Sequence, residues 1–74
     1  MYSLTSSSEG KLLTKEMHVL GGVKQLNNEF MAWVNIADEL EISLGTKPTE
    51  DKAIKALVKF LAIEHPIGGY NSYS

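Results

Sequence analysis

The chain has 74 residues, of which seven are lysine and nine are aspartate or glutamate, so its formal net charge is −2. A chain of this length forms one domain whose single core gives only a few kcal/mol of net stability. Oligomerisation commonly adds stability to domains of this size. It contains no cysteine, which excludes disulfides and thiolate metal sites and is compatible with the cytoplasm. The acidic balance and the absence of arginine argue against a duplex-DNA binder without excluding nucleic acid as a partner.

Residues 1–10 (MYSLTSSSEG) are rich in serine and threonine and have neither the basic start nor the apolar stretch of a signal peptide. Elsewhere the uninterrupted apolar stretches are only a few residues long, too short to span a membrane. We therefore expect a mobile leader at 1–10 and a cytoplasmic protein without membrane contact, located in the host cell if the protein is viral.

A short first helix is predicted after the leader. Thr14 suits an N-cap and Glu16 favours the helix dipole, so the helix would run to about Leu20. A strand is the alternative, because residues 15–19 partly alternate between polar and apolar side chains. The pair Gly21-Gly22 then marks a break or a close approach of two backbones, since glycine destabilises a helix interior.

A second helix is predicted from Val23, or at the latest from Asn28, to about Leu44. At 100° per residue its apolar side chains fall on one broad arc. Glu41 projects from within that arc. We interpret it either as a carboxylate that reaches solvent at the end of the helix or as one paired with a lysine of another element.

The last helix has the clearest start. Gly45 and Pro48 indicate a connector, and Thr49 suits an N-cap before the acidic first turn Glu50-Asp51. The helix is expected to run to Glu64 or His65, where Pro66 stops it, and a flexible tail follows over 67–74. The predicted fold class is therefore all-α: one domain over residues 11–66, a short three-helix bundle that assembles into a dimer or a larger helical oligomer.

The apolar side chains of this last helix are the main reason to expect an oligomer. By the same arithmetic they cover about 220° of its circumference, more than one neighbouring helix can bury. A subunit interface is the economical solution. Together with Phe30 and Trp33, which are more often core than ligand cage, the predicted interface comprises Ala53, Ile54, Leu57, Val58, Phe60 and Leu61.

The remaining wedge of the last helix carries Lys52, Lys55 and Lys59 on consecutive turns. Such a stripe is usually a solvated face. The functional alternative is that these lysines bind a phosphate-bearing ligand or an acidic patch of a partner.

Catalysis, metals and cofactors are not expected. His18 and His65 are the only histidines, and neither belongs to a cluster with the spacing of a zinc site. Neither glycine pair has the flanking residues of a phosphate-binding loop. The many serines lie in segments that look mobile, with no base to activate a nucleophile.

Two resemblances add to this interpretation. Leu13-Thr14 followed by Glu16–Lys24, and Ala56–Lys59 with Ala62 and Pro66, are similar to the opening and closing helices of phage anti-CBASS sponge proteins. Members of that family are short helical oligomers that sequester cyclic oligonucleotide signals of bacterial immunity. The resemblance implies Lys24 as a contact to a ligand phosphate.

The second resemblance is to ribbon-helix-helix repressors and antitoxins. Asn28–Phe30, the segment through Leu40, and residues 49–61 are similar to their two helices, the second of which is buried in a dimer. This resemblance would make Glu16–Leu20 the DNA-reading strand, although Glu16, His18 and Leu20 suit neither phosphates nor base edges.

The sequence thus favours a non-enzymatic, self-associating binding protein whose partner is itself or another protein. The specific hypothesis is a phage-type anti-defence protein that sequesters a small anionic ligand, such as a cyclic nucleotide, through Lys24, Lys52, Lys55 and Lys59. The alternatives are a ribbon-helix-helix DNA-binding repressor or antitoxin, and a protein-protein adaptor, inhibitor or assembly component of a larger particle.

Overall fold

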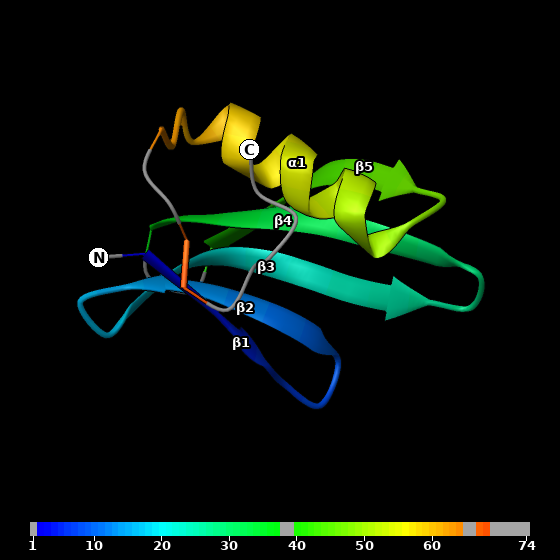
Figure 1. Cartoon of the computed structure of the whole chain (residues 1–74). Coiled ribbons are helices and arrows are strands. Elements are labelled where there is room, and N and C mark those ends of the chain that lie inside the picture. The colour runs from blue at the N-terminus through cyan, green and yellow to red at the C-terminus, as the bar shows by residue number, and fades with distance from the viewer. Residues whose placement is uncertain (1, 38–39, 65–66, 69–74) are drawn as a thin grey trace.

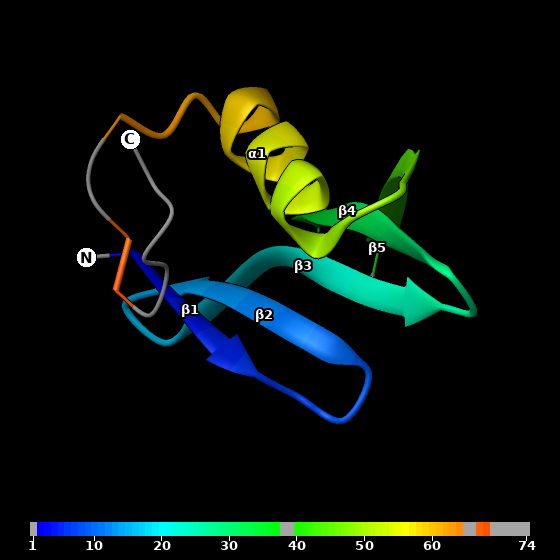
Figure 2. The ribbon, with the colours of Figure 1, turned by 45° about the vertical axis from the view of Figure 1, so that its right-hand side comes forward.

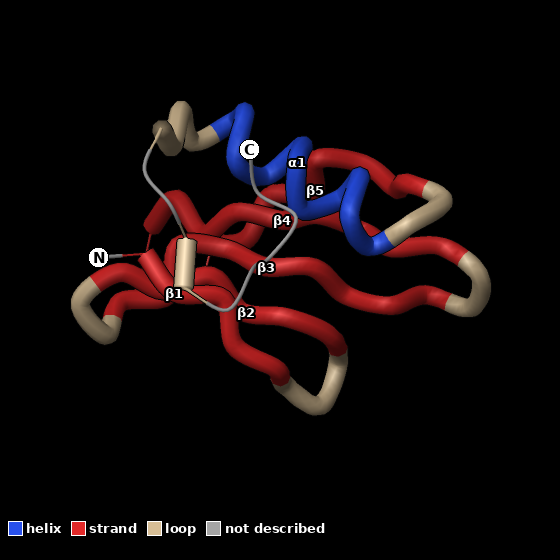
Figure 3. Tube along the Cα trace, in the orientation of Figure 1, coloured by secondary structure: helices blue, strands red, loops and turns tan. Residues whose placement is uncertain are grey.

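A computed structural model of the chain describes residues 2–37, 40–64 and 67–68. Its strands run up and down in chain order, each paired antiparallel with the next, and a helix follows the last strand (Figures 1 and 3). The elements are β1 Tyr2–Ser6, β2 Gly10–Lys15, β3 His18–Leu26, β4 Glu29–Ala37, β5 Leu40–Lys47 and α1 Glu50–Phe60.

The all-α prediction, with its three-helix bundle, is therefore wrong. Residues 2–6, assigned to a leader, form β1, and the predicted first helix is the end of β2, a turn and the start of β3. The predicted second helix lies in β3, β4 and β5. In β4 the cause is visible: Ala32, Trp33 and Val34 are all buried, so both faces of the strand are apolar and no alternation appears.

One of the turns between strands lacks the residues that usually indicate a hairpin. Glu16 and Met17 join β2 to β3 with φ values of 52° and 71°, the left-handed region that a two-residue hairpin loop requires. Asparagine and glycine are the usual residues there, and neither is present. Asn27, with φ of 54°, occupies the corresponding loop between β3 and β4.

The pair Gly21-Gly22 lies at the centre of β3, where the sheet is covered on both faces. A Cβ on Gly21 would lie 3.0 Å from Leu57 Cδ1 of α1, whereas a Cβ on Gly22 would lie 2.9 Å from the Trp33 ring. Successive residues of a strand face opposite sides, so α1 and Trp33 lie on opposite faces of the sheet. Of the two alternatives for this pair, a break or a close approach of two backbones, the structure shows the close approach.

The main core lies between the sheet and α1, which packs on β3, β4 and β5 (Figures 1 and 2). Ile63 and Ile67, after α1, belong to the same buried core as Leu4 of β1 and Leu13 of β2, and Gly68 forms a parallel bridge with Ser3 at the outer edge of β1. The buried side chains of this core are Leu4, Leu13, Val23, Ala32, Val34, Ala53, Ile54, Leu57, Ile63 and Ile67.

Both ends of α1 are set by local hydrogen bonds. The Thr49 side chain accepts from the Lys52 N–H, which confirms the predicted N-cap. The helix ends at Phe60 rather than at 64 or 65, because Ala62 takes φ of 54° and the Ile63 N–H donates to the Val58 carbonyl oxygen. This is a Schellman C-cap, and alanine replaces its usual glycine, so the sequence contains no stop signal there.

Gly22→Ala tests whether the close approach at β3 holds the sheet together. The added Cβ meets the backbone carbonyl oxygen of Lys11 and the Trp33 ring, neither of which gives way freely. We expect a loss of about 1–3 kcal/mol in unfolding free energy, measured by denaturant titration. Gly68→Ala is the control, because its nearest atoms lie 3.7 Å away and little change is expected. Equal effects of the two substitutions would contradict the packing described.

Candidate functional site

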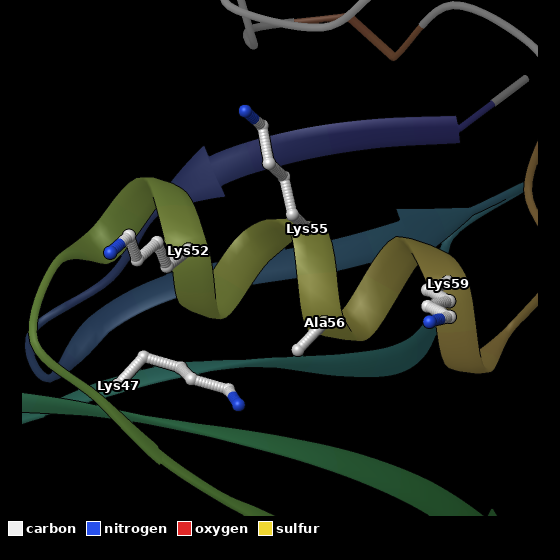
Figure 4. A pocket seen from close by; sticks show the side chains of 5 residues that line it. All are labelled: Lys47, Lys52, Lys55, Ala56 and Lys59. Carbon is white, nitrogen blue, oxygen red and sulfur yellow. The ribbon is translucent and has the colours of Figure 1, made fainter.

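Four lysines from two elements line one shallow depression on the surface of α1. Lys52, Lys55 and Lys59 come from α1 and Lys47 from the end of β5, and they lie around Ala56 (Figure 4). The depression has a volume of about 320 Å³. The small side chain of Ala56 lies between the longer lysine side chains, which surround it with positive charge.

An apolar depression adjoins this cationic one. It has a volume of about 420 Å³, is lined by Leu44 and Phe60, and shares Ala56 and Lys59 with its neighbour. The two together form a groove between α1 and β5, which we call the α1–β5 groove. One half of the groove is cationic and the other is apolar, so it suits a ligand with an anionic group and an apolar or aromatic part.

The charge of the groove is only partly neutralised by the chain itself. Asp51 lies 3.3 Å from Lys55, one helical turn away, and both side chains are largely exposed, so this pair contributes little to stability. Within the described part of the chain, no carboxylate lies within 4.0 Å of the ammonium groups of Lys47, Lys52 or Lys59. These three ammonium groups are the ones most available to a bound anion.

Sequence spacing grouped Lys52, Lys55 and Lys59 correctly on one face of α1. It missed Lys47 and Leu44, which reach the groove only because β5 pairs with β4 beneath the helix. No local signal identifies them, since a basic residue just before a helix cap is common on protein surfaces.

Most of the predicted interface residues lie in the core, and one lies at the surface. Ala53, Ile54 and Leu57 are buried inside the chain, and Val58 and Leu61 are partly buried against the same core. The sheet therefore covers most of the apolar arc of α1. Phe60 stays 57% exposed at the apolar half of the groove. Phe30 packs partly buried against the core, and Trp33 is buried on the other face of the sheet.

Lys24 lies away from the other lysines. It shares a face of β3 with Gly22, and its ammonium nitrogen lies 5.4 Å from the centre of the Trp33 ring, on the face opposite α1. The same ammonium donates to Glu41 of β5 at 3.2 Å. Glu41 is therefore paired with a lysine of another element, which was one of its two interpretations.

Trp33 is 5% exposed although no helix of the described residues covers its face of the sheet. The glycine beneath it leaves space for the indole to lie on β3, and the Lys24 side chain extends over the ring to reach Glu41. The indole Nε1–H is buried and has no hydrogen-bond acceptor among the described residues. This cluster buries Trp33 on the second face of the sheet.

Lys24→Ala is expected to expose Trp33, the one tryptophan of the chain. The substitution removes both the covering stem and the cation over the ring, so we expect red-shifted tryptophan emission and a loss of about 1 kcal/mol in unfolding free energy. Glu41→Gln removes only the exposed ion pair and should leave the emission unchanged. If Lys24→Ala also leaves the emission unchanged, the side chain does not cover the indole.

No helix of the described residues is long and apolar enough to cross a membrane. Over the same residues, no group of three or more histidines, aspartates or glutamates lies close enough to hold a metal ion. No protein-family model, no curated protein and no solved structure matches the chain.

Proposed function

We propose that this chain is a non-enzymatic binding protein that sequesters a small phosphate-bearing ligand in the α1–β5 groove. The observation that carries this proposal is that Lys47, Lys52, Lys55 and Lys59 line the same shallow depression. A solvated lysine stripe needs only the helix, whereas this depression is also lined by a lysine of β5 (Figure 4). We place this activity in the cytoplasm, of a host cell if the protein is viral.

A cyclic nucleotide fits both halves of the groove. Its phosphates carry the negative charge that the lysines attract, and lysine is a common phosphate ligand in proteins. Its base is flat and largely apolar on its faces, which suits the exposed ring of Phe60 beside Lys59. The ligand hypothesis drawn from the sequence is thus kept for Lys52, Lys55 and Lys59, with Lys47 added.

Lys24 has no place in this groove, because it lies on the opposite face of the sheet in contact with Trp33 and Glu41. The ribbon-helix-helix alternative needs two helices after its strand, and α1 is the one helix in the described part of the chain. We therefore propose ligand sequestration ahead of DNA binding. A protein-protein adaptor stays as the second candidate, favoured by the exposed apolar side chains beside β5.

A ligand panel tests the proposal by thermal unfolding and calorimetry. The panel contains cyclic mono-, di- and trinucleotides, inorganic phosphate and a short DNA duplex. We expect at least one cyclic nucleotide to raise the melting temperature, because a ligand that binds the folded state stabilises it by mass action. Binding should weaken as salt rises.

The double variant Lys52→Gln/Lys59→Gln should weaken binding of that nucleotide by about tenfold or more, since each substitution removes a charged contact. Lys11→Gln/Lys15→Gln on β2 removes the same charge away from the groove and should leave the affinity unchanged. Lys24→Gln should also leave it unchanged. A panel without any thermal shift contradicts the proposal. Equal losses of affinity in both double variants would mean that net charge, rather than the groove, causes the binding.

A further inference from the structure

The two edges of the sheet differ in their backbone hydrogen bonds. At the β1 edge, the Leu4 N–H donates to the Gly68 carbonyl oxygen at 2.8 Å and the Gly68 N–H donates to the Tyr2 carbonyl oxygen at 3.0 Å. At the β5 edge, β4 is the one backbone partner of Leu40–Lys47 among the described residues. An edge strand with unpaired N–H and C=O groups is a template for another strand.

Local geometry limits the part of β5 that can accept a strand. Gly45 takes φ of 98°, and its N–H donates to the Ser43 Oγ at 3.1 Å, so the strand departs from regular extended geometry there. The pairing between β4 and β5 also shifts between Met31 and Trp33, opposite this point. A second shift lies between Asn35 and Ala37, where the extra residue belongs to β4, so the segment of β5 before its own irregularity at Gly45 is the five residues Leu40–Leu44.

Apolar side chains on the helix-covered face line this segment. Leu40 is 52% and Ile42 is 42% exposed, and Leu44 continues the row into the apolar half of the α1–β5 groove. Ile36 of β4, on the same face, is 55% exposed. The strip formed by Ile36, Leu40, Ile42, Leu44 and Phe60 is thus an apolar surface directly beside a strand edge that has no backbone partner among the described residues.

We propose that a second copy of this chain occupies the edge, with the two β5 strands antiparallel and Ile42 on the two-fold axis. Leu40 then lies opposite Leu44 of the second copy, and Ile42 lies opposite its own equivalent. Glu41 lies opposite Ser43 of the second copy on the other face. Apolar residues meet apolar residues and the carboxylate meets a hydroxyl, which is the cross-strand pairing that stabilises a sheet.

The neighbouring registers are less favourable. A two-fold axis at Glu41 would place two carboxylates directly opposite each other, which is destabilising. An axis at Ser43 would place Glu41 opposite Gly45 of the second copy, where the irregular geometry interrupts pairing. The axis at Ile42 alone uses all five residues of the segment Leu40–Leu44, and the segment is therefore complementary to itself.

The pairing has consequences for the whole assembly. A two-fold axis perpendicular to the sheet keeps each side chain on its own face, so both copies of α1 lie on the same side of one continuous sheet. The apolar strips of the two copies meet between the helices, and Leu40 of the second copy approaches Leu44. The cationic half of each groove is built by one copy alone, so the dimer does not depend on the proposed ligand.

Light scattering of the ligand-free protein tests the association. We expect the mass of a dimer at high micromolar concentration, and a monomer for Ile42→Lys, which would bring two ammonium groups together on the axis. Leu26→Lys is the matched control, because Leu26 is 44% exposed on β3 away from this edge, and it should stay dimeric. Circular dichroism checks that both variants are folded. A monomeric wild type, or a dimeric Ile42→Lys, overturns the proposal.

Cysteine cross-linking tests the register, since the chain has no cysteine of its own. Ile42→Cys should form a disulfide-linked dimer rapidly under mild oxidation, because the two sulfurs would start from directly opposed positions. Ser43→Cys should react much more slowly. Faster linkage of Ser43→Cys than of Ile42→Cys would place the axis at Ser43 and overturn the proposed register.

Discussion

The fold depends on the absence of side chains at two successive positions of β3. Gly21 lets Leu57 of α1 approach the strand, and Gly22 lets the Trp33 ring lie on its other face. A side chain at either position would displace one of these neighbours. A 74-residue chain cannot build a thick core, so close contact on both sides of a central strand is how this sheet buries apolar surface efficiently.

This arrangement also divides the charged residues into two sets with different roles. On one face Lys24 covers Trp33 and pairs with Glu41, so its charge is already used in packing. On the other face Lys47, Lys52 and Lys59 have no carboxylate within ion-pair distance among the described residues. These three lysines therefore keep their charge available for a ligand.

The apolar arc of α1, which pointed to association from the sequence, is mostly covered by the sheet. Ala53, Ile54 and Leu57 are buried within the chain itself, whereas Phe60 and the apolar side chains of β5 stay exposed. Association is thus favoured by the β5 edge and Phe60 rather than by the whole circumference of the helix.

Most of the features that the sequence predicted correctly have local causes. The N-cap at Thr49 and the grouping of the α1 lysines follow from residues within one or two helical turns. The strands pair with their neighbours in the chain, and their sequences lacked the usual strand and hairpin signals at two places. β4 is apolar on both faces, and Glu16 and Met17 form a hairpin loop without asparagine or glycine. Lys47 joins the groove through the sheet, which no helical spacing can reveal.

Nuclear Overhauser contacts at the glycine pair test this packing most directly. We expect contacts from the Gly21 Hα protons to the Leu57 methyls, and from the Gly22 Hα protons to the Trp33 ring, with cross-strand contacts joining Gly22 to Trp33 and Trp33 to Ser43. Helical contacts three and four residues apart through residues 28–44, with neither glycine contact, would contradict it.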